Sequence, residues 1–249
     1  LLAEQAKILF AEAVENHSRD KQWHRWYRCS LCEQQYHGVV YCALGWACWK
    51  TYLGRPESDW ARQSAMTELG NGLSSARHDE DALSVREAEL AVMRRLGGSE
   101  ENMLALQSNL ANTYEVLGRY ERALQMQQEA YSGRVRLNGE EHEQTLRAAD
   151  NYALSLLTLR RFEEAKALLR KTMPVARRVL GEGDQLTLKM RHSYAASLCN
   201  DPAATLDDVR GAVATLEDVE WTARRVLGGA HPRTVNIGRG LQNARAALA

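Results

Sequence analysis

The sequence predicts an all-α protein made of stacked antiparallel helix pairs, with a small cysteine-containing helical head at its N-terminal end. Three observations predict this fold class. A unit of about 42 residues recurs along the chain, apolar residues fall three and four positions apart, and helix-forming residues dominate the composition. Only four prolines and two phenylalanines occur among the 249 residues. A single helix pair cannot bury its apolar stripe, so successive pairs must stack to form a core.

The recurring unit is clearest in two short strings. Asn-Leu-Ala at 109–111 returns as Asn-Tyr-Ala at 151–153 and as Ser-Tyr-Ala at 193–195, a step of 42 residues each time. Gly-Arg-Tyr-Glu-Arg-Ala at 118–123 returns as Arg-Arg-Phe-Glu-Glu-Ala at 160–165 with the same step. Several positions therefore keep one period over successive copies, which indicates a structural repeat.

Each unit is predicted to contain two helices. Apolar positions that fit helical spacing in one unit are Leu106, Leu110, Tyr114 and Leu117, then Ala123, Met126, Ala130 and Leu137. Gly118 is expected to end the first helix in a left-handed conformation. His142 and the His231-Pro232 pair stand where the next helices should begin, as cap residues. The last repeat step is longer than the others, which predicts an insertion near residues 200–208.

The Asn-Leu-Ala-x-x-Tyr-x-x-x-Gly-Arg-Tyr-x-x-Ala string at 109–123 and the Leu-Gly-x-x-His-Pro-x-Thr string at 227–234 resemble the tetratricopeptide repeat, in particular the 42-residue repeat of kinesin light chains. The resemblance covers residues 60–249. It implies a right-handed α-solenoid whose concave face binds peptides. The copy at 184–195 departs from the pattern, with Asp in place of His and Ser in place of Asn, and the copy at 200–227 lacks the Gly-Arg-Tyr turn.

The head, residues 1–37, contains a Cys-x-x-Cys pair formed by Cys29 and Cys32. This spacing directs two thiolates at one tetrahedral Zn²⁺, which needs two further ligands. His37 and Cys42 are the candidates for them. With only half of a ligand set certain, the chain is expected to bind zinc weakly or not at all, since structural zinc depends on a complete set.

Residues 38–59 are expected to form a helix that links the head to the repeats. In this reading Cys42 and Cys48, six positions apart, do not share a helix face and are small core residues instead of ligands. The stripe expected to be buried comprises Val40, Ala43, Leu44, Ala47 and Tyr52. Three tryptophans are expected to pack between head and first repeat rather than to form a docking surface: Trp46, Trp49 and Trp60.

The order of a helix, aromatic residues and Cys-x-x-Cys-x-x-x-Tyr at 29–36 also resembles the closing half of a RING-CH zinc finger. That family has eight zinc ligands, and only Cys29 and Cys32 match here. The resemblance implies an alternative function, the substrate-recognition part of a RING-CH ubiquitin ligase whose zinc-binding first half would precede Leu1. Zinc would then be a cofactor of the longer protein, and none is expected in this chain.

Composition narrows the range of functions. Lys and Arg together number 32, as do Asp and Glu, so the broad basic field typical of nucleic-acid or membrane-surface binding is missing. No apolar window is long enough to span a membrane. Five cysteines, an odd number, favour reduced thiols and an intracellular, cytoplasmic location. No phosphate-binding loop, nucleophile motif or zinc-protease motif occurs, so no catalysis is expected from these residues alone. The sequence does not indicate an oligomeric state.

A protein or peptide is therefore the expected partner, held by polar residues on the first helix of each unit. By position these are Asn71, Ser108, Asn109, Asn112, Arg147, Asp150, Asn151, Lys189 and His192. Asparagine suits this role because its side chain both donates and accepts hydrogen bonds, although each position fits a plain solvated residue equally well. Arginine pairs that end the second helices, such as Arg177-Arg178, are attributed to the favourable interaction of cations with helix C-termini.

Overall fold

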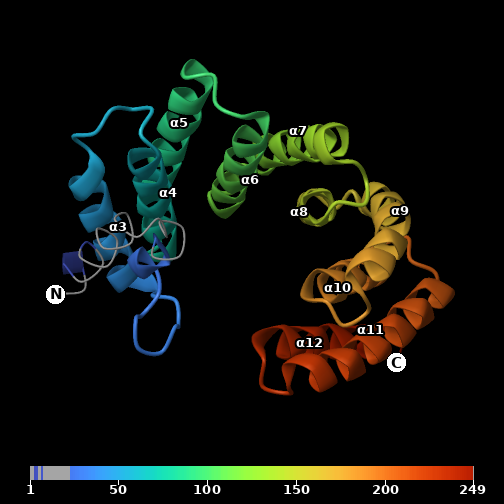
Figure 1. The fold of residues 1–249 in the computed structure, drawn as a ribbon. Coiled ribbons are helices and arrows are strands. Elements are labelled where there is room, and N and C mark those ends of the chain that lie inside the picture. The colour runs from blue at the N-terminus through green and yellow to red at the C-terminus, as the bar shows by residue number, and fades with distance from the viewer. Residues whose placement is uncertain (1–2, 5–6, 8–22, 249) are drawn as a thin grey trace. The chain divides into compact units, whose positions relative to one another are not determined.

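The structure is a computed structural model that describes residues 3–4, 7 and 23–248. Most of the predicted head before Trp23 therefore lies outside the described residues. Within them the chain is a series of α-helices and contains no strand (Figure 1). A short 3-10 helix, η1 (His24–Trp26), comes first. The helices are α3 (Gly38–Tyr52), α4 (Trp60–Ser75), α5 (Asp79–Arg95), α6 (Glu100–Val116), α7 (Tyr120–Asn138), α8 (Glu143–Thr158), α9 (Phe162–Leu180), α10 (Gln185–Cys199), α11 (Leu206–Leu227) and α12 (Pro232–Ala246).

The helices belong to two compact units, Leu1–Arg119 and Tyr120–Ala249. In the first unit α3 packs on α4, α4 on α5 and α5 on α6. In the second unit every helix packs on the next, and the alternate helices α8, α10 and α12 also contact one another in that order. The predicted all-α fold of helix pairs is confirmed, and the first helices of successive pairs are neighbours in the second unit.

The helix boundaries follow the predicted caps. Gly118 ends α6 with a φ of 73°, the left-handed region in which a side chain would be strained. The imidazole of His142 accepts a hydrogen bond from the Gln144 amide at 3.2 Å, and His231 caps α12 in the same way, directly before Pro232. Asp184, which replaces the histidine in its copy, keeps the capping role by accepting from the first amides of α10. A side-chain N-cap therefore begins all three helices, and it is a histidine in two of them and an aspartate in the third.

The predicted insertion lies in the connection between α10 and α11. The chain leaves α10 after Cys199 and enters α11 at Leu206, whereas the turns 117–119 and 159–161 are shorter. Thr205 and Asp208 form a capping box, in which the Thr205 hydroxyl accepts from the Asp208 amide at 3.1 Å and the Asp208 carboxylate accepts from the Thr205 amide at 2.9 Å. The inserted residues therefore end in a strong helix start signal.

In the first unit, the described end of the head packs on α3 and α4. Trp23 and Trp26 are buried against Cys48 and Tyr52 of α3, and Ala61 and Ala65 of α4 complete this cluster. The indole of Trp23 donates a hydrogen bond to Glu68 at 3.2 Å, and the Tyr41 hydroxyl donates to the same carboxylate at 2.7 Å. Glu68 therefore ties both the head and α3 to α4.

The buried side of α3 differs from the predicted stripe. Leu44 and Tyr52 are buried as expected, and so is Cys48, which confirms its role as a small core residue. The prediction that Val40 and Trp46 are core residues is wrong, since both are exposed. Trp60 is 45% exposed, although the centroid of its ring lies 4.9 Å from that of Trp23. Ala43 is exposed as well. The prediction and the structure differ because the face of α3 that packs on α4 is formed by Leu44, Gly45 and Cys48.

Two glycines bring α3 and α4 unusually close. A Cβ atom on Gly45 would lie 2.8 Å from the carbonyl oxygen of Glu68, and one on Gly72 would lie 2.8 Å from that of Tyr41. Both obstacles are backbone atoms of the opposite helix, which cannot move aside like a side chain. The helices can therefore pack at this distance only while both positions lack a side chain.

Gly72→Ala is expected to lower the unfolding free energy by about 1–3 kcal/mol, because the added methyl group overpacks the contact between α3 and α4. Gly211→Ala is the matched control, since Gly211 lies in α11 with no atom near the position of its absent Cβ. In that open position alanine should stabilise the helix by up to about 1 kcal/mol. Denaturant melts followed by circular dichroism would measure both changes, and equal shifts in the same direction would contradict the close contact.

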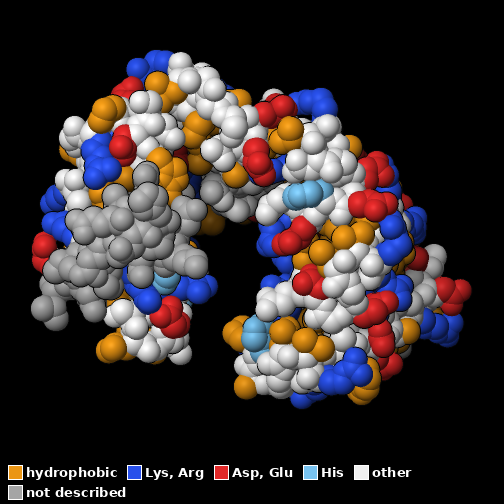
Figure 2. Space-filling model, viewed as in Figure 1, with side chains coloured by type: hydrophobic (Ala, Val, Ile, Leu, Met, Phe, Trp, Pro, Cys, Tyr) orange, Lys and Arg blue, Asp and Glu red, His pale blue; other side chains and the backbone are white. Residues whose placement is uncertain are grey.

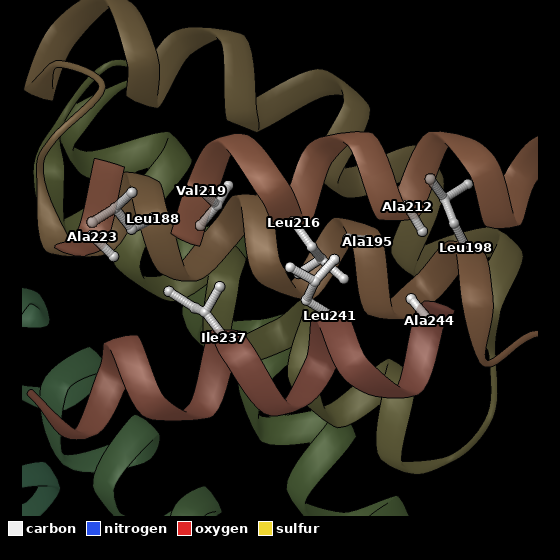
Figure 3. Packing of buried hydrophobic residues seen from close by; sticks show 10 residues of the cluster. All are labelled: Leu188, Ala195, Leu198, Ala212, Leu216, Val219, Ala223, Ile237, Leu241 and Ala244. Atoms are coloured by element: carbon white, nitrogen blue, oxygen red, sulfur yellow. The ribbon is translucent and has the colours of Figure 1, made fainter. Parts of the chain in front are cut away.

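The core of the second unit continues from helix to helix. Its largest cluster joins α10, α11 and α12, as Figure 3 shows, and consists of Leu188, Ala195, Leu198, Ala212, Leu216, Val219, Ala223, Ile237, Leu241 and Ala244. Each of the three helices contributes both alanines and branched side chains to it. A second cluster links α8, α9 and the start of α10 through Leu146, Leu169 and Met190. This neighbour-to-neighbour burial is the packing expected of a repeat protein.

Candidate ligand-binding pockets

The structure does not assemble the predicted four-ligand metal site. Cys29 and Cys32 lie in a tight loop, closed by the Cys29 amide donating to the Gln34 carbonyl at 2.9 Å. Cys42 instead faces Leu69 and Leu73 of α4, and His37 immediately precedes α3. Among the described residues no group of three or more His, Cys, Asp and Glu side chains is placed to hold a metal ion. Cys29 and Cys32 therefore stay together as a candidate pair of ligands, and among the described residues His37 and Cys42 are not placed to complete a set with them.

The Cys29 thiol has an unusual environment within that loop. The Cys32 and Leu31 amides donate hydrogen bonds to its sulfur, the latter at 3.5 Å, and they lower the pKa of Cys29 to about 7. A thiol with such a pKa is partly deprotonated at neutral pH. This thiolate fraction makes Cys29 a nucleophilic thiol of the loop.

In the first unit, three predicted asparagines gather around one pocket. The pocket has a volume of about 230 Å³ and is lined from α6 by Asn109, Asn112 and Thr113, with Ser74, Arg77, Asp79, Arg86 and Val116 completing its wall. Asn71 of α4 lies beside it and accepts a hydrogen bond from Arg86 at 3.0 Å. Ser108, by contrast, is not part of the lining. The positions chosen from the repeat pattern thus converge in this unit, with one exception.

Arg86 is the residue of this pocket that sequence reasoning missed. It lies on α5, a second helix, where no ligand contact was expected. Its guanidinium reaches across to α6, where it donates to the Asn109 carbonyl at 3.1 Å and to the Thr113 hydroxyl. Burial lowers its pKa from the ordinary value of arginine. The only signal in the sequence was a basic residue about two turns into a second helix, and most such residues are solvated.

A buried carboxyl group stands one turn beyond Arg86. Glu89 is held between α5 and α4, where the Thr67 hydroxyl donates to it. Burial is the main reason that its pKa rises from 4.5 to about 7, and the nearby Glu68 carboxylate raises it further. The folded protein therefore holds the proton of Glu89 at a pH where the unfolded chain has released it.

Glu89→Gln is expected to remove part of the pH dependence of stability. The stabilisation from holding this proton is complete below about pH 4.5 and is lost as the pH rises through about 7, at about 1.4 kcal/mol per unit of pKa difference. Relative to wild type, the variant should therefore gain up to about 3 kcal/mol between pH 4.5 and pH 8. Urea melts at several pH values measure this. Glu121→Gln, an exposed control on α7, should follow wild type, and a Glu89→Gln curve parallel to wild type would refute the assignment.

Asp150 is the main correction in the second unit. Sequence position marked it as an exposed contact residue, yet its side chain is 0% exposed. Lys189 Nζ lies 2.6 Å from its Oδ2 atom, and the Ser193 hydroxyl lies 3.5 Å from Oδ1. Asp150 and Lys189 therefore neutralise each other at the contact between α8 and α10. Both were predicted to bind a partner, and the structure uses both to join two first helices.

The other predicted contact residues of α8 have ordinary surroundings. Arg147 is exposed and pairs with Glu143 on its own helix at 2.6 Å, and Asn151 is half-buried. Two arginines that end a second helix, α9, are paired with acids, Arg177 with Glu182 at 2.6 Å and Arg178 with Glu141 at 2.8 Å. Their placement in the last helical turn agrees with the helix-terminus interpretation.

A pocket of the second unit lies between α10 and α12, and we refer to it as the α10–α12 pocket. It has a volume of about 310 Å³. Its lining consists of His192, Ala196, Cys199, Asn200, Leu216, Asn236, Arg239, Gly240 and Asn243. His192, a predicted contact residue, is therefore in place. A Cβ atom on Gly240 would stand 2.8 Å from His192 Nε2, so this glycine makes room for the imidazole.

The four residues that α12 contributes were absent from the sequence prediction. Asn236 and Asn243 each lie three or four positions from Arg239 and from Gly240, so all four residues lie on one side of the helix. That prediction named no residue of this helix. The regular spacing of polar residues on this helix was the signal that identifies its face.

Charge is mixed over the rest of the surface. Figure 2 shows Lys and Arg side chains interspersed with Asp and Glu over the face in view, with no large field of one sign. None of the described helices is both long and apolar enough to cross a membrane. The pockets of the two units are thus local features on a surface of balanced charge.

Comparisons with known proteins agree with the repeat. Residues 102–178 match the family model described as tetratricopeptide repeat. No curated protein sequence matches the chain. A putative kinesin light chain from Podosopora anserina with nearly identical TPR-like repeats has a similar structure, with 17% identity, a TM-score of 0.61 and coverage of 90% of this chain and 93% of that one.

Two further solved structures are similar. BtubC from P. vanneervenii has 16% identity and a TM-score of 0.54, with 84% of each chain covered. A Rap protein complexed with competence and sporulation factor has 14% identity and a TM-score of 0.51, with coverage of 99% of this chain and 65% of that one. These matches leave the RING-CH resemblance of residues 29–36 without support. The chain has the fold of a tetratricopeptide-like helical-repeat protein of the kind found in kinesin light chains, and its residues 102–178 match the tetratricopeptide family.

Proposed function

We propose that this chain is a protein-interaction scaffold that binds a protein or peptide segment on the first helices of its pairs. The α10–α12 pocket is the observation that carries this proposal. Polar side chains from two neighbouring first helices surround it, while Leu216 and Ala196 give it an apolar part. Convergent polar groups around an apolar surface are typical of a binding site for an extended segment.

The first unit supports the same function independently. Its pocket is also lined by asparagines of a first helix, Asn109 and Asn112, which can donate to and accept from a peptide backbone. A structural neighbour, the Rap protein, was solved in complex with competence and sporulation factor, so a protein of this fold can hold a partner. Neither pocket presents a closed set of catalytic groups, whereas both present hydrogen-bonding groups suited to holding a chain.

A library of random displayed peptides of about twelve residues, which span roughly 40 Å when extended, tests the proposal. We expect peptides to be enriched on the immobilised chain and to bind at least about tenfold more weakly to the double variant Asn236→Ala/Asn243→Ala, a loss of about 1.4 kcal/mol. Arg210→Ala on α11, a second helix, is the control and should bind the selected peptides as wild type does. Failure to enrich any peptide, or equal binding by all three proteins, would overturn the proposal.

A further inference from the structure

We infer that the α10–α12 pocket selects a segment that carries an acidic side chain, whose carboxylate pairs with Arg239. This inference rests on the proposed function, because it concerns which protein segment the scaffold binds. It combines three properties of the second unit: an arginine without an acidic partner, a lining without any acidic residue, and flanking groups suited to a peptide backbone.

The first property is the unpaired state of Arg239. No carboxylate among the described residues lies within ion-pair distance of it. Elsewhere in the second unit, several arginines are paired with acids: Arg161, the N-cap of α9, with Glu164 at 2.6 Å, and on α11 Arg210 with Asp207 at 3.0 Å and Arg224 with Glu220 at 2.7 Å. On α12 itself Arg245 pairs with Glu217 at 2.7 Å. The arginine that lines the pocket thus keeps its donors available, in a unit where most others are occupied.

The second property is the charge of the surroundings. The lining contains no Asp or Glu, and two acids near these helices are already paired, Asp150 with Lys189 and Glu220 with Arg224. Arg233, about two turns before Arg239 on α12, adds a second positive charge, and its buried Nε atom has no hydrogen-bond partner among the described residues. Burial, followed by the charge of Arg233, lowers the pKa of His192, which therefore stays neutral at neutral pH. The positive potential comes from guanidinium groups.

The third property is the arrangement of neutral groups around Arg239. Asn236 and Asn243 stand one turn before and one turn after it on the same face of α12. Their amides can hold the backbone of a segment while the guanidinium takes a carboxylate through two parallel hydrogen bonds. Ala196 and Cys199, both half-buried, offer apolar contact to the methylene groups that precede that carboxylate. The occupant that this combination fits is an acidic segment of another protein.

Selection from the random peptide library on three proteins tests the inference: wild type, Arg239→Glu and Arg210→Glu. The last variant makes the same charge change at an exposed arginine of α11. We expect Asp and Glu to be at least about twofold enriched in peptides selected on wild type and on Arg210→Glu, and not enriched on Arg239→Glu. One selected peptide, with its enriched acid replaced by the amide, should bind wild type about tenfold more weakly and Arg239→Glu with little change, as a double-mutant cycle requires.

The outcomes separate the two proposals. Peptides enriched on wild type without an excess of acidic residues, or with the same excess on Arg239→Glu, would overturn this inference and leave the scaffold proposal standing. If no peptide is enriched on any of the proteins, the scaffold proposal itself fails. Arg239→Gln serves in place of Arg239→Glu if circular dichroism shows that the glutamate variant has lost its helical content, and the same loss of acidic preference is expected.

Discussion

Replacing Lys189 with methionine should lower the unfolding free energy by about 3–5 kcal/mol at neutral pH, because it leaves a buried carboxylate without its counter-charge. Lys189 Nζ lies 2.6 Å from Asp150, whose side chain is fully buried between α8 and α10. Methionine keeps the length of the side chain and removes its charge. Urea melts followed by circular dichroism at 222 nm would measure the loss.

The double variant Asp150→Asn/Lys189→Met is the control for this prediction. It removes the charge that Lys189→Met leaves unpaired, so it should recover most of the lost stability. Burial raises the pKa of Asp150 above the ordinary 3.8. The contribution of its protonation to the unfolding free energy is therefore complete below pH 3.8 and is lost as the pH rises through the folded pKa. The deficit of Lys189→Met should therefore shrink on acidification. A deficit below about 1 kcal/mol, or one that Asp150→Asn leaves unchanged, would contradict the buried pair.

Trp26→Ala should also lower the unfolding free energy by about 3–5 kcal/mol, the usual range for truncating a buried tryptophan. Trp26 is 1% exposed and packs against Cys48, Tyr52 and Ala61, so alanine would leave a cavity between the head and the first helices. The ring centroid of Tyr52 lies 6.0 Å away in an edge-on arrangement, and that contact would be lost as well. Guanidinium melts followed by circular dichroism test the effect.

Trp46→Ala is the matched control for the head. It removes the same side chain from α3, at a position that is 44% exposed, so the expected loss stays below about 1 kcal/mol. Equal losses for the two variants would show that the aromatic cluster does not hold the head to α3 and α4. A large loss for Trp46→Ala alone would restore the packing that the sequence pattern had predicted.

The fold could be predicted from the sequence because repeats present the same local signals several times. The caps at His142 and His231 and the left-handed Gly118 are each set by a few neighbouring residues, so their pattern is visible without knowledge of tertiary contacts. The insertion before Leu206 could be predicted for the same reason, since a break in a period is a local observation.

Burial on individual helix faces could not be predicted as well. The buried side of α3 depends on the place where α4 approaches it, and that place is fixed by Gly45 and Gly72, which read in the sequence only as weak helix formers. The pattern of apolar residues alone assigned Val40 and Trp46 to the core because both are large and apolar. A close contact through glycines leaves no periodic signal.

The candidate site was predicted in part. Asn109, Asn112 and His192 were found because first-helix positions follow from the repeat. Asp150 was wrongly predicted to be exposed, and Arg239 was not predicted at all. Whether a polar side chain is paired can depend on a residue some 40 positions away in the sequence, as Asp150 depends on Lys189. Asp150 of α8 pairs with Lys189 of α10, whereas no acid of the described residues pairs with Arg239, and the sequence does not distinguish the two cases.

Photo-crosslinking tests the central claim most directly. The photoreactive amino acid p-benzoylphenylalanine replaces Asn236 in one variant, at the α10–α12 pocket, and Arg210 in a second variant, on α11 outside it. Each variant is irradiated with a labelled peptide taken from the library selection. Binding on the first helices predicts a crosslinked product from position 236 and none from position 210. A product from position 210 without one from position 236 would place the binding surface on the second helices of the pairs and contradict the account.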